Sequence, residues 1–239
     1  MKKILILGLF SLMFTNCQSQ FWRESIRGNK NIVKENRKVG NFDGIFITGS
    51  YEVVLQKGKE GKLQIQADEN LLPIIETYVK GNKLYIKTNK KFEIKKFTSL
   101  KVLLPIEDID KISITGSGTV SSNTLWNFED LKLSITGSGN IDLNLKSNQI
   151  KASVTGSGSI HLQGTSQNVS YSITGSGGIY AQNLNADEAK ARVTGSGQIK
   201  VKAIAYLDAN VTGSGDIIYI GNPERLKSKI LGSGSIYTK

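Results

Sequence analysis

The stretch Ile114-Thr115-Gly116-Ser117-Gly118 decides how this chain folds, because it recurs through the second half of the sequence. Thr-Gly-Ser-Gly returns at steps of 18 to 21 residues, and a last copy reads Leu231-Gly232-Ser233-Gly234. A fixed period with a glycine turn at one phase indicates a solenoid, in which one unit stacks on itself. The complete copies begin at Thr115, Thr136, Thr155, Thr174, Thr194 and Thr212.

The residues on both sides of each copy alternate between apolar and polar. Around the first copy, for example, Ile112, Ile114 and Val120 are apolar, and the corresponding positions of later copies match. Such period-2 alternation predicts two strands per repeat with one inward face. Repeating strands stack in parallel, and parallel crossovers prefer right-handed winding. We therefore predict an all-β fold, a right-handed parallel β-helix of coils of about 19 residues.

The glycines of the repeat mark the turn between the two strands of a coil. We expect at least one glycine in each turn to need a positive φ. The in-phase Thr and Ser hydroxyls should form polar ladders beside the turn, and one reading of such a regular ladder is binding to an ordered lattice such as ice. The predicted turn glycines are Gly116, Gly118, Gly137, Gly139, Gly156, Gly158, Gly175, Gly177, Gly195, Gly197, Gly213, Gly215, Gly232 and Gly234.

The start of the chain reads as an export signal. Met1-Lys2-Lys3 is basic, and the apolar run from Ile4 to Phe14 is too short to span a bilayer but suits a signal peptide over residues 1–16. Cys17, the only cysteine, follows this run and resembles the lipidated cysteine of bacterial lipoproteins, although Phe14 and Asn16 depart from the usual pattern. The alternative is ordinary cleavage that leaves a free thiol. Residues 17–38 are polar and read as a lipidated cysteine followed by a flexible tether.

Residues 39–239 are predicted to form the β-helix domain, with a cap and irregular coils over 39–110 and the repeats over 111–239. Ile47-Thr48-Gly49-Ser50 is a worn copy of the repeat, and Tyr51 replaces its second glycine. Strands are expected at 51–56, 63–67, 83–88 and 99–104, with a hairpin turn at Gly81-Asn82. The one expected helix, over 69–77, is interrupted by Pro73.

The worn copy near Thr48, the six or seven Ser-Ile-Thr-Gly-Ser-Gly repeats and the lipoprotein-like signal resemble a bacterial family: the putative autotransporter adhesins with a head GIN domain. The resemblance covers roughly residues 39–239. It implies a β-helix related to pectate-lyase and acyltransferase folds without their catalytic residues. It also implies an adhesion-like or binding role.

The charge of the chain limits its partners. The formal net charge of +11 favours anionic surfaces such as acidic polysaccharide or lipid headgroups. Nucleic acid is not expected as a partner, because the export signal separates the chain from it. The densest positive cluster, Lys90 to Lys96, could grip an anionic glycan, but such a run is more often a solvated strand face or loop.

No constellation of catalytic, cofactor-binding or metal-ligating residues is evident. The only histidine, His161, is expected to face outward beside Asp142 on the preceding coil, and such a surface pair is usually a weak ion pair. The sequence lacks CxxC and HExxH motifs. We expect no enzyme activity, no cofactor and no metal. A glycan- or protein-binding surface is expected instead, made of outward residues on one sheet: His161, Gln163, Tyr180, Gln182 and Lys200.

The alternation fails near the C-terminus. Ile217 to Ile220 is apolar on both faces, Leu231 replaces an outward Thr, and Tyr237 is expected to point outward. We expect this last coil to be uncapped, and open apolar coils tend to associate. A homo-oligomer or other partner contact is therefore predicted through Ile218, Ile220, Leu231 and Tyr237.

Together these observations predict a non-catalytic lipoprotein of the bacterial cell envelope, held at the outer membrane by a lipid on Cys17. Adhesion or surface binding through one face of the β-helix is the expected role. The alternatives are a structural scaffold of the envelope and, third, a polysaccharide-active enzyme. The side of the membrane that displays the protein is left open.

Overall fold

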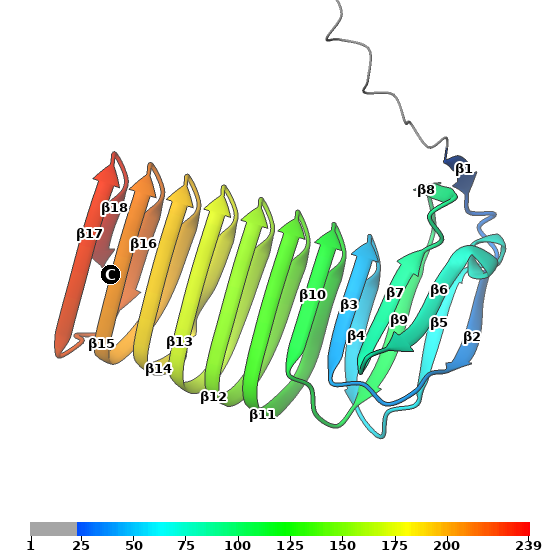
Figure 1. The fold of residues 1–239 in the computed structure, drawn as a ribbon, viewed down its shortest axis with the longest axis horizontal. Helices are drawn as coiled ribbons and strands as arrows, with labels where there is room; N and C mark the ends of the chain where they lie inside the picture. Colours follow the sequence, from blue (N-terminus) through cyan, green and yellow to red (C-terminus); the bar gives the residue numbers. More distant parts are fainter. Residues whose placement is uncertain (1–22) are drawn as a thin grey trace, which may run out of the picture.

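The computed structural model describes residues 23–239, so the predicted signal peptide and Cys17 lie outside the described residues. Within this range the chain forms a β-solenoid of about 7 turns, with coils of about 19 residues. The coils wind right-handed from the capped N-terminal end to the C-terminal coil (Figure 1). The predicted fold class is thereby confirmed. No helix of residues 23–239 is long and apolar enough to cross a bilayer.

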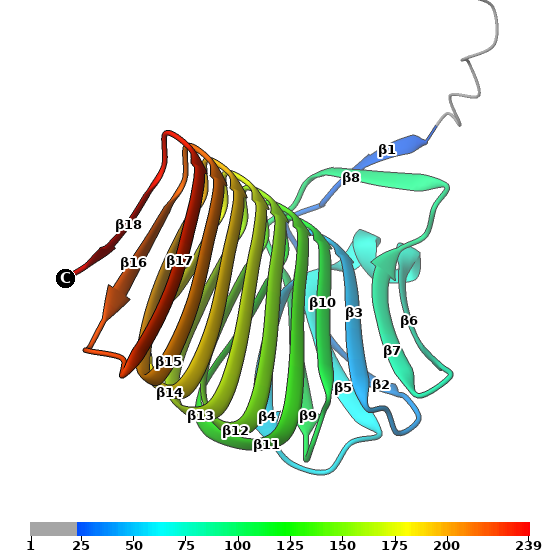
Figure 2. The same ribbon diagram turned by 60° about the vertical axis from the view of Figure 1, so that its left-hand side comes forward.

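Each regular coil is one long bent strand that runs from one glycine corner to the next (Figure 2). The sequence predicted two separate strands per repeat, but each regular coil is a single strand whose pairing is interrupted only by local register shifts, such as the one between Ser121 and Leu125. Buried serines close the bend within the strand, as where Ser147 Oγ donates a hydrogen bond to the Glu129 carbonyl at 2.9 Å. The long strands are β11 (Thr119–Gly137), β12 (Asn140–Gly156), β13 (Ser159–Gly175), β14 (Gly178–Gly195) and β15 (Gln198–Gly213).

Residues before and after each corner lie in two different sheets. We call the residues that lead into a glycine corner the pre-corner sheet and those that leave it the post-corner sheet. Successive coils pair in parallel and in register, so that Thr136 lies beside Thr155 and Thr155 beside Thr174. The Thr row that the sequence predicted is present, and its members are exposed: Thr48, Thr115, Thr136, Thr155, Thr174, Thr194 and Thr212.

The two glycines of a corner are needed for different reasons. The first has a positive φ in every copy, for example 118° at Gly175, which confirms the expectation from the sequence. The second, such as Gly177, lies against the corner of the preceding coil: a Cβ there would lie 2.5 Å from the Gly158 carbonyl oxygen. The corner thus depends on backbone conformation at one glycine and on close approach at the other.

The worn first copy shows why Tyr51 can stand at the second glycine position. No earlier corner precedes it, and the Tyr51 ring fills the space at the cap with 1% of its surface exposed. Its hydroxyl forms a 2.8 Å hydrogen bond with Thr88 Oγ1. Burial raises the pKa of Tyr51 to about 12, although the hydrogen bond with Thr88 acts in the opposite direction.

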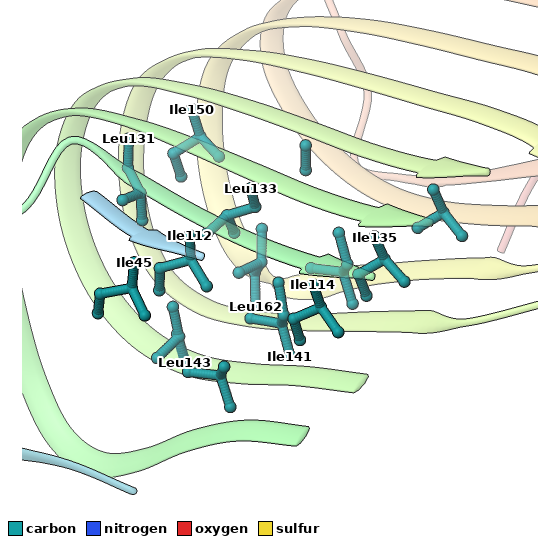
Figure 3. Close-up of a cluster of buried hydrophobic side chains, with 14 of the residues drawn as sticks. Ile45, Ile112, Ile114, Leu131, Leu133, Ile135, Ile141, Leu143, Ile150 and Leu162 are labelled. Carbon is teal, nitrogen blue, oxygen red and sulfur yellow. The ribbon is translucent and has the colours of Figure 1, made fainter. Parts of the chain in front are cut away.

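The inward side chains of both sheets form one continuous core along the solenoid (Figure 3). Ile112, Leu133 and Ile150 of successive coils are buried, and burying each such side chain contributes roughly 1.5–3 kcal/mol before the entropy cost. Sizes compensate between coils: Tyr171 lies in register between Ala152 and Ala191, so the ring fills the space that the two alanines leave.

Tyr171 also carries a buried hydroxyl without a hydrogen-bond partner. Burial raises the pKa of this hydroxyl. We expect Tyr171→Phe to raise the free energy of unfolding by about 1 kcal/mol, because it removes an unsatisfied buried polar group. Urea denaturation followed by circular dichroism measures this change.

The matched control is Tyr51→Phe, in which the same atom is removed from a buried tyrosine that has a partner. Here the hydrogen bond with Thr88 is lost, and we expect the free energy of unfolding to fall by about 1 kcal/mol. Opposite signs for the two variants support the explanation. Equal losses would contradict it.

The N-terminal end is an irregular cap around the first rung, which is formed by β3 (Gly44–Gly49) and β4 (Glu52–Lys57). On one side, β3 pairs with β10 (Lys111–Gly116), the start of the regular coils. On the other side, β3 pairs with β7 (Lys83–Thr88), and β4 pairs with β9 (Leu100–Ile106). In chain order, the first rung is therefore followed by the cap strands. The regular coils come after the cap strands and pack on the other side of the first rung.

Antiparallel strands close the cap. β6 (Ile75–Lys80) pairs with β7 through the predicted hairpin turn, in which Gly81 and Asn82 have φ of 54° and 57°. β5 (Lys62–Asp68) pairs with β9 and with β2 (Ile32–Lys38). The four strands expected within 51–104 are confirmed as β4, β5, β7 and β9.

Two predictions for this region are wrong. The helix expected over 69–77 is a 3-10 helix, η1 (Glu69–Ile74), and the chain then enters β6, since Pro73 cannot donate a helical hydrogen bond. The expected flexible tether does not reach residue 38. Residues 24–27 form β1 (Glu24–Arg27), and β2 covers the open edge of β5. Exposed and half-buried side chains alternate along β2, and Val33 of this strand packs against the core.

The remaining strands lie at the two ends of the solenoid (Figure 1). β1 pairs with β8 (Phe92–Lys96), so the basic cluster of residues 90–96 is largely a solvated strand, as favoured from the sequence. The last rungs consist of β16 (Asp216–Ile220), β17 (Arg225–Gly232) and β18 (Ser235–Thr238), which continue the parallel pairing.

Candidate functional site

The post-corner sheet brings together three of the outward residues predicted from the sequence. His161 and Tyr180 lie on neighbouring rungs with their rings stacked at a centroid distance of 4.8 Å. Lys200, on the next rung, places its Nζ 5.6 Å from the centre of the Tyr180 ring. Gly178 makes room for this arrangement, since a Cβ there would lie 2.5 Å from the Tyr180 ring.

The two glutamines predicted for this surface differ from each other in exposure and in register. Gln163 is exposed, but its register partner on the next rung is Asn183 rather than Gln182. A register shift displaces Gln182, and its Oε1 is buried without a hydrogen-bond partner. The shift arises because this coil is one residue longer than the coil before it.

The enzyme alternative requires Asp142 and His161 to act as an acid–base pair, but in the structure the two residues are only neighbours. Asp142 and His161 are register partners, and both are exposed. The imidazole packs on Tyr180, and no hydrogen bond or ion pair of the described chain joins it to Asp142. Across residues 23–239 no three His, Cys, Asp or Glu side chains are grouped as metal ligands would be.

The outward face of the pre-corner sheet carries three parallel rows: the Ser and Thr ladders expected from the sequence, and a basic row that the sequence analysis did not name as a site. The rows lie at fixed phases four residues, two residues and none before the Thr, so their signal was readable in the repeat itself. The first row is basic over three successive rungs, at Lys111, Lys132 and Lys151. The second row holds serines at Ser113, Ser134, Ser153 and Ser172, and the third is the Thr row.

A hollow of about 270 Å³ interrupts this face over the next three rungs, on β13, β14 and β15. Short side chains at Ser170 and Ser172 form one wall, and Lys190 and Arg192 rise beside them. Asp208 lies on the far side and accepts a 2.7 Å hydrogen bond from Asn210 Nδ2. The hollow therefore combines hydroxyl groups with two cationic side chains.

At the capped end, the row of serines is continued by aromatic rings. Phe46 stacks on Tyr85 at 5.3 Å, and Tyr85 stacks on Tyr78 at 5.2 Å. The Nζ atoms of Lys83 and Lys111 lie 5.5 and 5.1 Å from the centre of the Phe46 ring. The pre-corner face is thus a continuous outer surface of rings, hydroxyl groups and cations.

The sequence of this chain matches the model of one family over residues 41–223, which include the first rung and most regular coils. That family is described as "Putative auto-transporter adhesin, head GIN domain". The chain belongs to this family. The resemblance stated from the repeats is confirmed.

Solved structures of similar proteins agree with this membership. A putative adhesin from Bacteroides fragilis is 28% identical, with a TM-score of 0.84 over 90% of this chain and 100% of that one. A putative lipid binding protein from Parabacteroides distasonis is also 28% identical, with a TM-score of 0.76 and the same coverage. A putative adhesin from Parabacteroides merdae, at 21% identity and a TM-score of 0.73, shows the shared fold. No curated protein matches the sequence.

Membership in this adhesin family supports a non-catalytic adhesion role at the cell surface or in the envelope. The family is described as an adhesin family, and the Bacteroides fragilis neighbour is likewise described as a putative adhesin. For a member of this family, the outward faces of the pre-corner and post-corner sheets are the candidate binding surfaces of the described chain.

The C-terminal residues predicted to associate lie beyond or at the edge of the family match. Leu231 and Tyr237 are 55% and 47% exposed, as expected. Ile218 is only 7% exposed, so the prediction that it offers an outward contact is wrong. It lies in register between Lys200 and Tyr237, and these two longer side chains shield it. Ile220 is half-buried.

Proposed function

We propose that this chain is an adhesin of the bacterial cell envelope that binds its target through the pre-corner face. The observation that carries the proposal is the regular outward surface of that face, where hydroxyl and basic side chains repeat on successive rungs. Such a surface offers many weak contacts side by side, which is how an extended ligand gains affinity. Family membership supports the adhesion role.

We further propose that a lipid on Cys17 anchors the protein to the outer membrane. The folded part begins at Glu24, so the chain between anchor and fold spans at most about 25 Å. The capped end, with β1 and β8, would then lie close to the membrane surface, and the regular coils would extend beyond it (Figure 1). Lys96 at the end of β8 suits anionic headgroups, whereas Lys95 is paired with Glu93 at 2.8 Å.

Adhesion is tested with the purified chain from residue 23 onward, coated on beads and offered to host or bacterial cells. We expect beads that carry the wild type to adhere. A variant with Lys132→Glu, Lys151→Glu and Arg192→Glu on the pre-corner face should adhere less by about tenfold, since charge reversal adds repulsion to lost contacts. The matched control reverses three exposed basic residues on other surfaces: Lys59, Lys62 and Lys146.

Protease treatment of intact cells separates adhesion from the scaffold alternative. An adhesin must be cleaved on intact cells, because its binding face has to be displayed outside. Protection in intact cells, together with cleavage after the outer membrane is opened, would favour an envelope scaffold. The enzyme alternative is tested by turnover of acidic polysaccharide, which His161→Ala would have to abolish.

A further inference from the structure

The basic row of the pre-corner face is electrostatically unusual. Lys111, Lys132 and Lys151 are register partners on three successive parallel rungs and point outward. No carboxylate of residues 23–239 forms an ion pair with any of them within 4.0 Å. Like charges directly beside each other on neighbouring strands destabilise a sheet. Among the described residues no carboxylate pairs with this row, and only Lys111 has an aromatic partner, the Phe46 ring at 5.1 Å.

Two lysines of the cap do have a carboxylate as register partner. Lys101 lies beside its register partner Glu52 on the neighbouring strand, at 2.8 Å between Nζ and Oε1. Lys87 pairs with Glu76 at 3.3 Å in the same cross-strand manner. In the row over β10, β11 and β12 the register partners of the lysines are other lysines, a serine or a glycine, and no described carboxylate pairs with them.

The basic row leads directly into the hollow beside Arg192. Its next member is Ser170, followed by Lys190, and both line the hollow. Asp208 is the nearest carboxylate along the row, and it is engaged by Asn210 at 2.7 Å and by Lys227 at 4.0 Å. Neither Lys190 nor Arg192 forms an ion pair with another described residue. Both cations remain available to a ligand.

Two hydroxyl rows run beside the cations. Serines such as Ser134 and Thr residues such as Thr136 alternate along each strand, and rungs repeat about every 4.8 Å. Hydroxyl groups both donate and accept hydrogen bonds, so they suit sugar hydroxyls as well as anionic oxygens. The outward positions of β10 to β14 in these three rows hold no aromatic ring on which a nucleic-acid base could stack.

We propose that the basic row from Lys111 to Lys190, together with Arg192 beside it, binds a linear acidic polysaccharide. The polymer lies across the rungs, along the solenoid axis. The cations of successive rungs bind its carboxylate or sulfate groups, and the Ser and Thr rows bind its hydroxyl groups. In the hollow, the guanidinium of Arg192 binds one anionic group with two parallel hydrogen bonds. This proposal rests on the proposed adhesion function and names the ligand class of the same face.

Binding is measured by biolayer interferometry on the chain from residue 23 onward, with three immobilised polymers: polygalacturonate, chondroitin sulfate and neutral dextran. We expect binding to at least one acidic polymer and none to dextran. The affinity should fall steeply with added salt, because the contacts are exposed charges. Preference for polygalacturonate or for chondroitin sulfate identifies carboxylate or sulfate as the recognised group.

The decisive variant is Lys111→Gln, Lys132→Gln and Lys151→Gln, which removes the row and keeps the side chains polar. Affinity for the acidic polymer should fall at least about tenfold, because three ion pairs are lost. The control variant makes the same change at Lys59, Lys62 and Lys146, which lie outside the pre-corner sheet, and it should bind like the wild type. Circular dichroism verifies the fold of both.

Three results would overturn the proposal: no binding to either acidic polymer, an equal loss in the control variant, or equally tight binding to duplex DNA that depends on the same lysines. Failure of this proposal is distinguishable from failure of the proposed function. Beads that adhere to cells independently of the row would leave the adhesin proposal standing without this ligand. Polymer binding without any cell adhesion would instead retain the site and remove the adhesion role.

Discussion

Gly177→Ala is expected to lower the free energy of unfolding by about 3 kcal/mol or more, because it adds a methyl group where two corners touch. The new Cβ would lie 2.5 Å from the Gly158 carbonyl oxygen and 2.6 Å from Val154 Cγ1 of the preceding coil. The first of these neighbours is backbone and cannot turn aside. The φ of Gly177 lies outside the left-handed region, so the loss would measure close packing of corners alone.

Three further substitutions in urea denaturation separate the causes. Gly175→Ala combines a φ of 118° with a Cβ 2.6 Å from the Gly156 carbonyl oxygen, and should be at least as destabilising as Gly177→Ala. Gly81→Ala has a φ of 54° but nothing within 4 Å, so it should cost only about 1–2 kcal/mol. Ser176→Ala, at the exposed position between the two glycines, should change little. A Gly177→Ala protein as stable as the Ser176→Ala protein would refute the packing argument.

Asp68→Ala is expected to have the largest effect in the cap, a loss of roughly 3 kcal/mol in the free energy of unfolding. The Asp68 carboxylate is fully buried at the end of β5. It accepts hydrogen bonds from the backbone N–H groups of Lys30 at 2.6 Å, Thr98 at 2.7 Å and Ser99 at 3.3 Å. One side chain thus holds the β1–β2 turn and the loop before β9 against the cap, and alanine would leave these donors without an acceptor.

The same carboxylate makes stability depend on pH. Burial by itself raises the pKa of Asp68, but the hydrogen bonds from Thr98, Ser99 and Lys30 outweigh it and hold the pKa below its usual value. The folded pKa is therefore lower than the unfolded value of about 3.9. The stabilisation is complete above that value and is lost as the pH falls through the folded pKa.

The measurement compares melting temperatures of the wild type and Asp68→Asn, which keeps the shape and removes the charge. Their difference should stay constant from pH 7 to pH 5 and shrink below about pH 4. Asp187→Asn, at an exposed carboxylate on β14, is the control and should show no such trend. A difference for Asp68→Asn that does not vary down to pH 2 would show that the charge contributes nothing.

The regular coils were predictable because their determinants are local and repeated. Each Thr-Gly-Ser-Gly copy marks a corner, and the alternation around it assigns inward residues such as Ile114 and Ile135 without knowledge of the rest of the chain. The same reasoning failed at β2, whose residues look like a polar linker. β2 forms because it pairs with the edge of β5, which supplies partners for the backbone hydrogen bonds of β2.

The candidate binding surface was only partly predictable. His161 and Tyr180 were expected outside and together, and they stack. Gln182 was expected beside them, but the extra residue in its coil shifts the register and leaves Gln182 half-buried, with its Oε1 atom shielded from solvent. The Lys111 row was present in the repeat as well, but its significance depends on which neighbours it meets. Only the structure shows that its lysines lie beside one another without carboxylates.

The sequence by itself determined the architecture of this protein: the corner glycines, the inward rows and the period fix a parallel β-helix, because every coil repeats the same local steric and hydrophobic constraints. The tertiary structure alone decided the order of the strands in the cap. It placed β3 between β7 and β10 and β4 between β9 and β11, and it brought Asp68 to Lys30 and Thr98. These contacts join segments far apart in a part of the chain without a repeat, so no local pattern specifies them.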